Sequence, residues 1–376
     1  MKVKKIFFSF TLIMVIFIIF FSAKNILLPM KDTKEKNQQT SEFKVAKYWE
    51  KIRDNVVRCN LCPHQCVLQD EQIGLCKSRK NIKGTLYTLN YNKPVAVHID
   101  PIEKKPLYHF LPSSQIFSLG TAGCNFSCLN CQNWEISQIC PLNIRSYYFT
   151  PEEIIRMVKE SGCKSIAFTY TEPTVFYEYM YDICVLAKKE NIRTVIVSNG
   201  YINEKPLLDL IPYLDAANID LKSFSDEIYR NLNGGTLHPV LRTLKILKEH
   251  KIWVEITNLI VPQYTDNLNM IEEMVKWLVD NGFSETPLHF SRFFPAYKLS
   301  HLPPTPVEKI YKAIEIAKKA GIKYVYGGNL REEVNTYCPN CKSLLIKRIG
   351  YGVKIENLTK EGSCKNCNYK IAGVWE

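Results

Sequence analysis

From about residue 112 onward, short apolar runs of the kind found in β-strands alternate with helical patterns. The expected strands are QIFSLG (115–120), SIAFTY (165–170), TVIVSN (194–199), AANIDL (216–221), IWVEITNLIV (252–261), PLHFSRF (287–293) and YVYGG (324–328). At least five β–α units in series require parallel strands joined by right-handed crossovers. The chain is therefore expected to be an α/β protein with a doubly wound or barrel-like parallel sheet, whose chemistry lies at the C-terminal ends of the strands.

Two of the expected helices begin with the same local signal. Residues 150–153 (TPEE) and 305–308 (TPVE) each place Thr before Pro, with Glu three positions after the Thr. This pattern predicts a capping box with Pro at the first helical position. Gly321 is expected to end the helix that follows residue 308, because glycine accepts the left-handed conformation of a helix C-terminus.

The 14 cysteines fall into three clusters, and only Cys140, Cys163 and Cys184 stand outside them. The clusters are Cys59, Cys62, Cys66 and Cys76; Cys124, Cys128 and Cys131; and Cys338, Cys341, Cys364 and Cys367. A disulfide framework is typical of small secreted folds that lack a large core. In a chain of 376 residues, paired C-x2-C units indicate metal ligands in a reducing compartment instead.

The central cluster has the spacing C-x3-C-x2-C and follows the expected strand 115–120 directly. Three thiolates can hold three irons of a 4Fe–4S cluster and leave the fourth iron open to a substrate or cofactor. A site with four protein ligands, completed by Cys140 or a histidine, is the alternative. The small residues of TAG (121–123) before the first cysteine allow a close approach of the backbone.

The two flanking sets each offer four cysteines. Cys338 and Cys341 are separated by 22 residues from Cys364 and Cys367, around a β-hairpin pattern at 343–358, which predicts a zinc-ribbon-like module. Rubredoxin-like iron is the alternative at this site. The N-terminal set has the spacing C-x2-C-x3-C-x9-C, with His64 as a spare ligand, and its metal is either zinc or an auxiliary cluster.

The formal net charge of +12 does not indicate a nucleic-acid partner. Residues 1–40 hold seven Lys against two acidic residues, and thiolates bound to metal would offset most of the remaining excess. No nucleic-acid partner is therefore expected. A zinc-ribbon nucleic-acid binder would need a basic face with aromatic residues.

The N-terminus carries a separate signal. Residues 6–23 contain no charged side chain and, as a helix, would rise about 27 Å, which is enough to cross the hydrocarbon core of a bilayer. We expect a single-pass membrane anchor with the catalytic part on the cytoplasmic side, where iron–sulfur assembly takes place. A cleaved signal peptide is the alternative, although its apolar region is usually shorter. Residues 31–42 form a polar tether.

Several motifs together resemble those of the radical S-adenosylmethionine (SAM) superfamily. They are CNLCPHQC, SLGTAGCNFSCLNCQNWEISQ, FTYTEPTVFYEYM, SNGYI, NIDLKSF and the closing CPNC. The chain is most similar to the branch related to the pyruvate formate-lyase activating enzyme and, within it, to the radical enzyme of the AmmeMemoRadiSam system. The resemblance implies a partial β/α barrel that binds a 4Fe–4S cluster through Cys124, Cys128 and Cys131. It also implies reductive cleavage of SAM to methionine and a 5′-deoxyadenosyl radical, with an electron donor of the flavodoxin or ferredoxin class.

The resemblance implies SAM contacts at the ends of three strands. The residues concerned are Tyr170, Thr171 and Glu172, Ser198 and Asn199, and Asp220 and Lys222. The segment YTEP stands where the family commonly has G-G-E-P, and the carboxylate of Glu172 is a partner for the methionine amine. An ion pair at the end of the strand is the alternative for Asp220 and Lys222. Trp134, just after the cluster loop, is a weaker candidate for adenine.

The substrate is not evident from the sequence. HFSRFFPAY (289–297) lies at the end of the sixth expected strand, and its Arg292, His289 and Tyr297 suit an anionic or aromatic substrate. Packed aromatics with a surface arginine are the alternative for this segment. Two functional alternatives also remain: a glycyl-radical activase that acts on a partner protein, and a Cys-rich metal-binding or electron-transfer protein without enzyme activity.

These features divide the chain into four expected parts. They are a hydrophobic anchor with a polar tether (1–40), a Cys-rich N-terminal cap (41–111), a radical SAM partial barrel (112–330) and a zinc-ribbon-like module (331–376).

Overall fold

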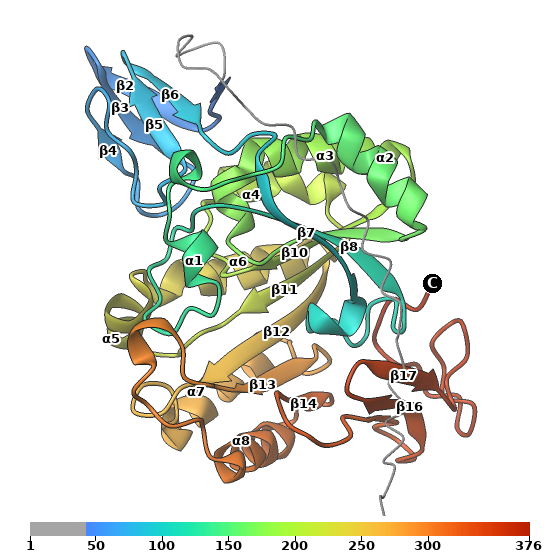
Figure 1. Ribbon diagram of the computed structural model, residues 1–376. Helices are drawn as coiled ribbons and strands as arrows, with labels where there is room; N and C mark the ends of the chain where they lie inside the picture. The colour runs from blue at the N-terminus through green and yellow to red at the C-terminus, as the bar shows by residue number, and fades with distance from the viewer. Residues whose placement is uncertain (1–42) are drawn as a thin grey trace, which may run out of the picture. The chain divides into compact units, whose positions relative to one another are not determined.

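The computed structural model describes residues 43–376, and its centre is an eight-stranded, mostly parallel sheet (Figure 1). The strands are β7 (Pro94–Pro101), β8 (Gln115–Thr121), β9 (Ser165–Phe168), β10 (Arg193–Ser198), β11 (Ala216–Asp220), β12 (Trp253–Ile260), β13 (Leu288–Arg292) and β14 (Val325–Gly328). They are ordered β14-β13-β12-β11-β10-β9-β8-β7, so neighbours in sequence are neighbours in the sheet. All pairs from β8 to β14 are parallel. This α/β arrangement is the one expected of a partial barrel.

Helices connect the consecutive parallel strands. They are α2 (Pro151–Ser161), α3 (Tyr177–Lys189), α4 (Glu204–Leu210), α6 (Leu237–Glu249), α7 (Leu268–Asp280) and α8 (Val307–Ala320). The capping box at the start of α2 is confirmed, because Thr150 accepts from the backbone of Glu153 and the Glu153 side chain accepts from Thr150. Gly321 ends α8 in the left-handed conformation, as expected.

The capping box predicted at the start of α8 is wrong. Pro306 is the N-cap of this helix, and no side chain caps it. The Thr305 hydroxyl donates to the carbonyl of Ile260 and accepts from the amide of Phe293 at 3.0 Å. Because these bonds connect the ends of β12 and β13, the Thr305 side chain stabilises the sheet and does not cap the helix.

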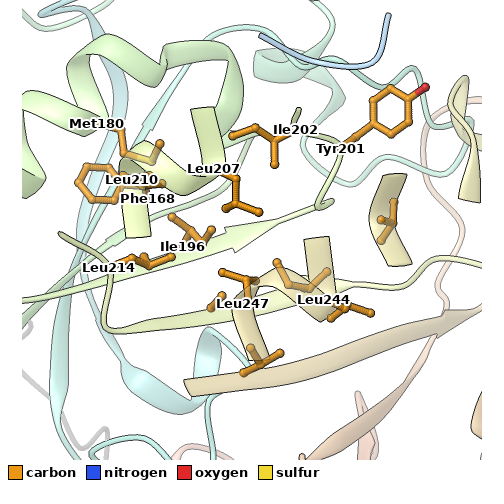
Figure 2. Close-up of a cluster of buried hydrophobic side chains, with 14 of the residues drawn as sticks. Phe168, Met180, Ile196, Tyr201, Ile202, Leu207, Leu210, Leu214, Leu244 and Leu247 are labelled. Carbon is orange, nitrogen blue, oxygen red and sulfur yellow. The ribbon is translucent and has the colours of Figure 1, made fainter. Parts of the chain in front are cut away.

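A buried apolar layer lies between the sheet and helices α3, α4 and α6 (Figure 2). Its members include Phe168 and Ile196 from the sheet, Met180 from α3, Leu207 and Leu210 from α4, and Leu244 and Leu247 from α6. Full burial of such a side chain stabilises a fold by about 1.5–3 kcal/mol. The layer therefore makes the sheet a rigid support for the loops that follow its strands.

Six short strands precede the large sheet and were not predicted from the sequence. They are β1 (Lys44–Val45), β2 (Trp49–Arg53), β3 (Val56–Cys59), β4 (Val67–Leu68), β5 (Arg79–Ile82) and β6 (Thr85–Thr88), in sheets ordered β1-β6-β5 and β2-β3-β4. β7, which pairs antiparallel with β8, was also not predicted. The six small strands are short or rich in charged residues, and β7 is mostly half-exposed, so none of them has the continuous buried apolar run of the parallel strands.

The C-terminal part is a three-stranded antiparallel sheet of β15 (Thr336–Tyr337), β16 (Leu344–Ile349) and β17 (Gly352–Ile355). The hairpin predicted at residues 343–358 is therefore confirmed. Arg348, on β16, is buried and donates to the carbonyl of Tyr108 and to the Thr336 hydroxyl, both at 2.7 Å. This buried arginine joins the C-terminal sheet to the loop between β7 and β8.

The predicted anchor, residues 6–23, lies outside the described residues. Within residues 43–376, every helix is too short or too polar to cross a bilayer.

Candidate functional site

The three central cysteines lie in the loop that follows β8, and each sulfur has a hydrogen-bond partner. The amide of Phe126 donates to Cys124 Sγ at 3.4 Å, and Asn233 Nδ2 donates to Cys128 Sγ at 3.2 Å. The Ser137 hydroxyl lies 3.2 Å from Cys131 Sγ. Donors around thiolates are the usual outer contacts of an iron–sulfur centre, where they set its reduction potential. The residues present therefore fit a cluster held by three thiolates.

Burial raises the pKa of two of these thiols, Cys124 and Cys128. Burial raises the pKa of Cys124 well above its usual range, and the nearby Glu172, Cys128 and Cys131 charges raise it further. Burial also raises the pKa of Cys128, against the lowering effect of Lys222. Thiols of this kind become thiolates when a metal centre replaces their protons.

The cluster loop is fixed to a π-helix, Tyr229–Asn233, that follows α5 (Asp226–Ile228). The amides of Ser127 and Leu129 donate to the carbonyls of Asn233 and Leu232 at 2.8 and 2.9 Å. Gly235 follows closely, and a Cβ at this position would lie 2.2 Å from the ring of Phe126. π-Helical turns are frequent at functional sites. Here the turn brings Asn233 against Cys128.

Glu172 lies in the loop after β9, as the N-cap of a short 3-10 helix (Pro173–Phe176). It is 2% exposed, and its carboxylate accepts four hydrogen bonds. Oε1 accepts from the amide and hydroxyl of Thr174 at 2.9 and 2.7 Å and from the Ser198 hydroxyl at 2.8 Å. Oε2 accepts from the amide of Asn199 at 2.8 Å. Burial raises the pKa of Glu172, although these four bonds lower it. The side chain of Ser198 and the backbone of Asn199 thus orient the carboxylate.

Asn199 also reaches the cluster loop. Its Nδ2 donates to Oδ1 of Asn125 at 2.8 Å, and Nδ2 of Asn125 donates to the carbonyl of Tyr201 at 2.8 Å. The residue after Cys124 is therefore held by the end of β10. Strand ends that are neighbours in the sheet meet at this edge, as parallel pairing requires.

Tyr170 occupies a position where the similar family commonly has glycine. Its φ of 66° is the left-handed conformation that glycine adopts readily and other residues rarely. The Tyr170 hydroxyl donates to Asp100 on β7 at 2.6 Å, while its carbonyl accepts from Asn133 at 2.6 Å. The Thr171 hydroxyl donates to the carbonyl of Thr121 at 2.8 Å. The tyrosine ring is thus directed toward β7, and the turn keeps the backbone shape that glycine would allow.

Asp220 and Lys222 form an ion pair at the end of β11, with 2.9 Å between Lys222 Nζ and Asp220 Oδ2. Burial by itself lowers the pKa of Lys222, but the negative charges of Asp220 and Cys128 outweigh this effect and raise it. The lysine is therefore a fixed positive charge close to the cluster cysteines. The ion pair and a ligand role are compatible, since both side chains remain partly exposed.

Of the three substrate candidates, Arg292 is the last residue of β13, and Tyr297 begins a short 3-10 helix that follows this strand. Tyr297 stacks on Trp134, with ring centroids 5.2 Å apart, and the amide of Lys298 donates to the carbonyl of Leu129 in the cluster loop at 3.0 Å. Nε of Arg292 donates to the carbonyl of Thr305 at 2.6 Å. Within residues 43–376, its two terminal nitrogens make no hydrogen bond, so they remain donors for an anion.

His289 is placed differently from the expectation that it lies at the end of the strand. It is the second residue of β13, 2% exposed, and its Nε2 lies 2.7 Å from the carboxylate of Glu255. Glu255 also accepts from the amides of Tyr108 and His109 at 2.9 and 2.7 Å. His289 therefore belongs to the buried network beside the C-terminal sheet.

The four C-terminal cysteines form a compact group that could bind a metal ion. Their sulfur atoms all lie within 4.8 Å of one another, and the Cys338–Cys367 and Cys341–Cys364 distances are both 3.6 Å. The Ser343 hydroxyl, 3.1 Å from Cys341 Sγ, helps to lower the pKa of Cys341 to about 6. The lowered pKa favours the thiolate form of Cys341, which is the form that binds a metal ion. Among residues 43–376, no other cysteine set is this compact.

Asn125, Ser137 and Asn233 were not predicted from the sequence as site residues. Asn125 and Ser137 lie close to the cysteines along the chain, but their partners do not follow from spacing. Asn233 is 105 residues from Cys128, and no motif links the two. Only a map of contacts could have found it.

Comparisons with known proteins agree with this geometry. The radical SAM superfamily model matches residues 118–278. The protein MJ0808 of Methanocaldococcus jannaschii is 48% identical over 329 residues, which cover 87% of this chain and 98% of that protein. The pyruvate formate-lyase 1-activating enzyme of Escherichia coli K12 is 25% identical over 219 residues, which cover 54% of this chain and 89% of that enzyme. The chain belongs to the radical SAM superfamily, as an enzyme related to the pyruvate formate-lyase activating enzymes.

Proposed function

We propose that this radical SAM enzyme takes a hydrogen atom from a small anionic substrate. Membership of the superfamily implies a 4Fe–4S cluster, SAM and an electron donor. When bound, the cluster supplies the electron that cleaves SAM to methionine and a 5′-deoxyadenosyl radical. The observation that carries the proposal is the meeting of three cysteines with Glu172 and the Asp220–Lys222 pair at the strand ends. The motifs CNLCPHQC and TYTEP favour the AmmeMemoRadiSam branch.

In this proposal, Cys124, Cys128 and Cys131 hold the cluster. SAM is held by the residues that follow the C-terminal ends of β9, β10 and β11, which together are called the rim. Glu172 receives the methionine amine, because its oriented carboxylate is a ready partner for a positive charge. Lys222 lies on the cluster side of the rim, where a positive charge suits the methionine carboxylate. Tyr170, Thr171, Ser198, Asn199 and Asp220 complete the proposed contacts, and Trp134 offers a ring for adenine. The electron donor is of the flavodoxin or ferredoxin class.

Asn233 is expected to tune the cluster. Replacing it with Leu removes the amide donor from Cys128 Sγ, so the negative charge of the reduced cluster loses a stabilising contact. A hydrogen bond to a charged group contributes about 1.5–3 kcal/mol, which corresponds to a potential roughly 60–130 mV lower for a one-electron couple. A redox titration followed by electron paramagnetic resonance measures the change. Asn281→Leu, on the outer end of α7, is the control, and an unchanged potential would remove Asn233 from this role.

Arg292 is the proposed contact for the anion, because a guanidinium binds a carboxylate or phosphate with two parallel hydrogen bonds. Arg292→Ala is expected to leave iron content and uncoupled SAM cleavage intact. Substrate-dependent turnover should fall by about 2–4 kcal/mol of transition-state binding, roughly 30- to 1,000-fold. Arg331→Ala, an exposed arginine, is the matched control.

The test uses deuterium-labelled cell extract incubated anaerobically with the enzyme and SAM. Deuterium in 5′-deoxyadenosine shows that a hydrogen came from the extract, and fractionation shows whether its source is small or a protein. Transfer from a small anionic fraction, reduced in Arg292→Ala, is the expected result. Equal transfer by the variant would exclude Arg292 from the substrate site.

Activation of a glycyl-radical enzyme is the second candidate. It is favoured by the match to 89% of the pyruvate formate-lyase 1-activating enzyme. In the same experiment, label that comes only from a glycine of a protein would establish this activity and exclude the small-molecule proposal.

We also propose zinc at the C-terminal cysteines and a membrane anchor at residues 6–23. Sulfur distances of 3.6 Å suit four thiolates around one tetrahedral ion, and metal analysis distinguishes zinc from rubredoxin-like iron. The uncharged N-terminal run supports an anchor. Residues 41–376 are proposed to face the cytoplasm because iron–sulfur assembly and SAM supply take place there. Protease added to intact spheroplasts should then leave the catalytic part uncut, and digestion from outside would contradict this orientation.

A further inference from the structure

We propose that Cys59, Cys62, Cys66 and Cys76 hold a second 4Fe–4S cluster, which passes electrons to the first. The four cysteines line one cavity. Cys59 ends β3, Cys62 and Cys66 lie in the loop before β4, and Cys76 lies in the turn before β5. The amide of Cys59 donates to the carbonyl of Cys66 at 2.9 Å, which holds this loop closed around the cavity.

The width of the site favours a cluster over a single ion. Four thiolates around one zinc lie about 3.8 Å apart, because each Zn–S bond is about 2.3 Å. The C-terminal set is close to this size, with two sulfur pairs 3.6 Å apart and all four sulfurs within 4.8 Å of one another. Within the described part of the chain, the N-terminal cysteines do not form such a compact group, and neither do the central three. A cube of four irons and four sulfides separates its thiolates more widely than one ion does.

Arg79 points independently to an anionic occupant of the cavity. Its side chain is 1% exposed and lines the cavity, and its guanidinium donates to both carboxylate oxygens of Glu178 at 2.7 and 2.8 Å. The Nε–H group of Arg79 is buried and has no partner in the described residues. A buried unpaired donor is costly. A thiolate or sulfide of the cluster would accept from it and would also face a positive charge.

Four thiolates give every iron of this second cluster a protein ligand, so its role is electron transfer and not substrate binding. The spare ligand His64 is already engaged, since its Nε2 lies 2.7 Å from the carbonyl of Asn125. In the transfer step, the second cluster would lose one electron and be oxidised, and the first cluster would gain that electron and be reduced. A low-potential donor protein of the ferredoxin or flavodoxin class then reduces it again.

The two cysteine loops touch, which makes this transfer short. Asn125, next to Cys124, lines the cavity of the N-terminal set. The Ser78 hydroxyl donates to the carbonyl of Ala122 at 3.0 Å. Gly123 has a φ of 98°, and a Cβ there would lie 2.6 Å from the carbonyl of Cys76. Glycine at position 123 thus allows the backbone of one cysteine loop to lie against that of the other.

The experiment measures the metal content of the full chain after anaerobic reconstitution. The second-cluster proposal rests on the proposed function only for the presence of the first cluster. We expect about eight irons and eight sulfides per chain in the wild type, and about four in Cys124→Ser/Cys128→Ser/Cys131→Ser. Cys59→Ser/Cys66→Ser should also retain about four. Cys163→Ser, a buried cysteine outside the three clusters, should retain all eight.

Two results would overturn the second cluster: two zinc ions per wild-type chain with about four irons, or a central triple variant that holds no iron. If Cys59→Ser/Cys66→Ser loses all its iron while the triple variant keeps about four irons, the double variant is misfolded. The iron content of the triple variant then decides whether the second cluster exists. If the triple variant keeps all its iron, the first cluster is misassigned and the proposed function fails instead. In the reduced wild type, magnetic coupling should broaden the two cluster signals, and unbroadened signals would exclude the electron path.

Discussion

Replacing Cys124, Cys128 and Cys131 together with Ala is expected to abolish the formation of 5′-deoxyadenosine from SAM. The three thiolates are the proposed ligands of the only cluster with an open iron, and the rim residues around them supply no substitute ligands. Reductive cleavage should fall to the background of the uncatalysed reaction. Chromatography of the products after anaerobic reduction with dithionite measures this loss.

The metal proposed at the C-terminal cysteines distinguishes loss of the site from loss of the fold. Its four cysteines belong to a different sheet, so the triple variant should keep one metal ion there. Cys163→Ala is the matched control and should cleave SAM as the wild type does. Persistent cleavage by the triple variant would refute the assignment of these cysteines.

The second large effect is expected from Glu172→Gln, which should weaken SAM binding. The four hydrogen bonds of this carboxylate come from N–H and O–H donors, so the NH2 group of Gln would face donors in place of acceptors. The methionine amine would also lose its charged partner. Together these changes should cost about 2–4 kcal/mol, or roughly 30- to 1,000-fold in Kd, measured by equilibrium dialysis with the reconstituted protein.

Glu103→Gln is the control for this prediction, because Glu103 is also buried but accepts from Ser113 between β7 and β8. It should leave the Kd for SAM unchanged.

SAM binding is also expected to depend on pH. Since the pKa of Glu172 is raised, the carboxylate gains its proton earlier than a free one as the pH falls, and SAM affinity should fall with it. An unchanged Kd in Glu172→Gln would remove this residue from the SAM contacts.

Much of the large sheet could be predicted from the sequence, because buried parallel strands are continuous apolar runs. Each of the seven expected runs overlaps one of β8 to β14, and its ends lie within two residues of the ends of that strand. The antiparallel β7 and the six small N-terminal strands could not be predicted in this way, since half-exposed strands mix polar and apolar residues. The capping signal at Thr305 failed for a related reason: its hydroxyl found backbone partners on β12 and β13.

The sequence by itself determined the cysteine sets, the parallel strands and the positions of Glu172, Ser198 and Lys222 at strand ends. These features are local, because they depend on spacing and on the apolar runs beside them. The tertiary structure alone decided which side chains meet. It brought Asn233 to Cys128 across 105 residues and placed His289 in a buried network away from the rim. It also set the widths of the cysteine sites, since the distance between two sulfurs depends on how separate loops pack and not on their spacing in the chain.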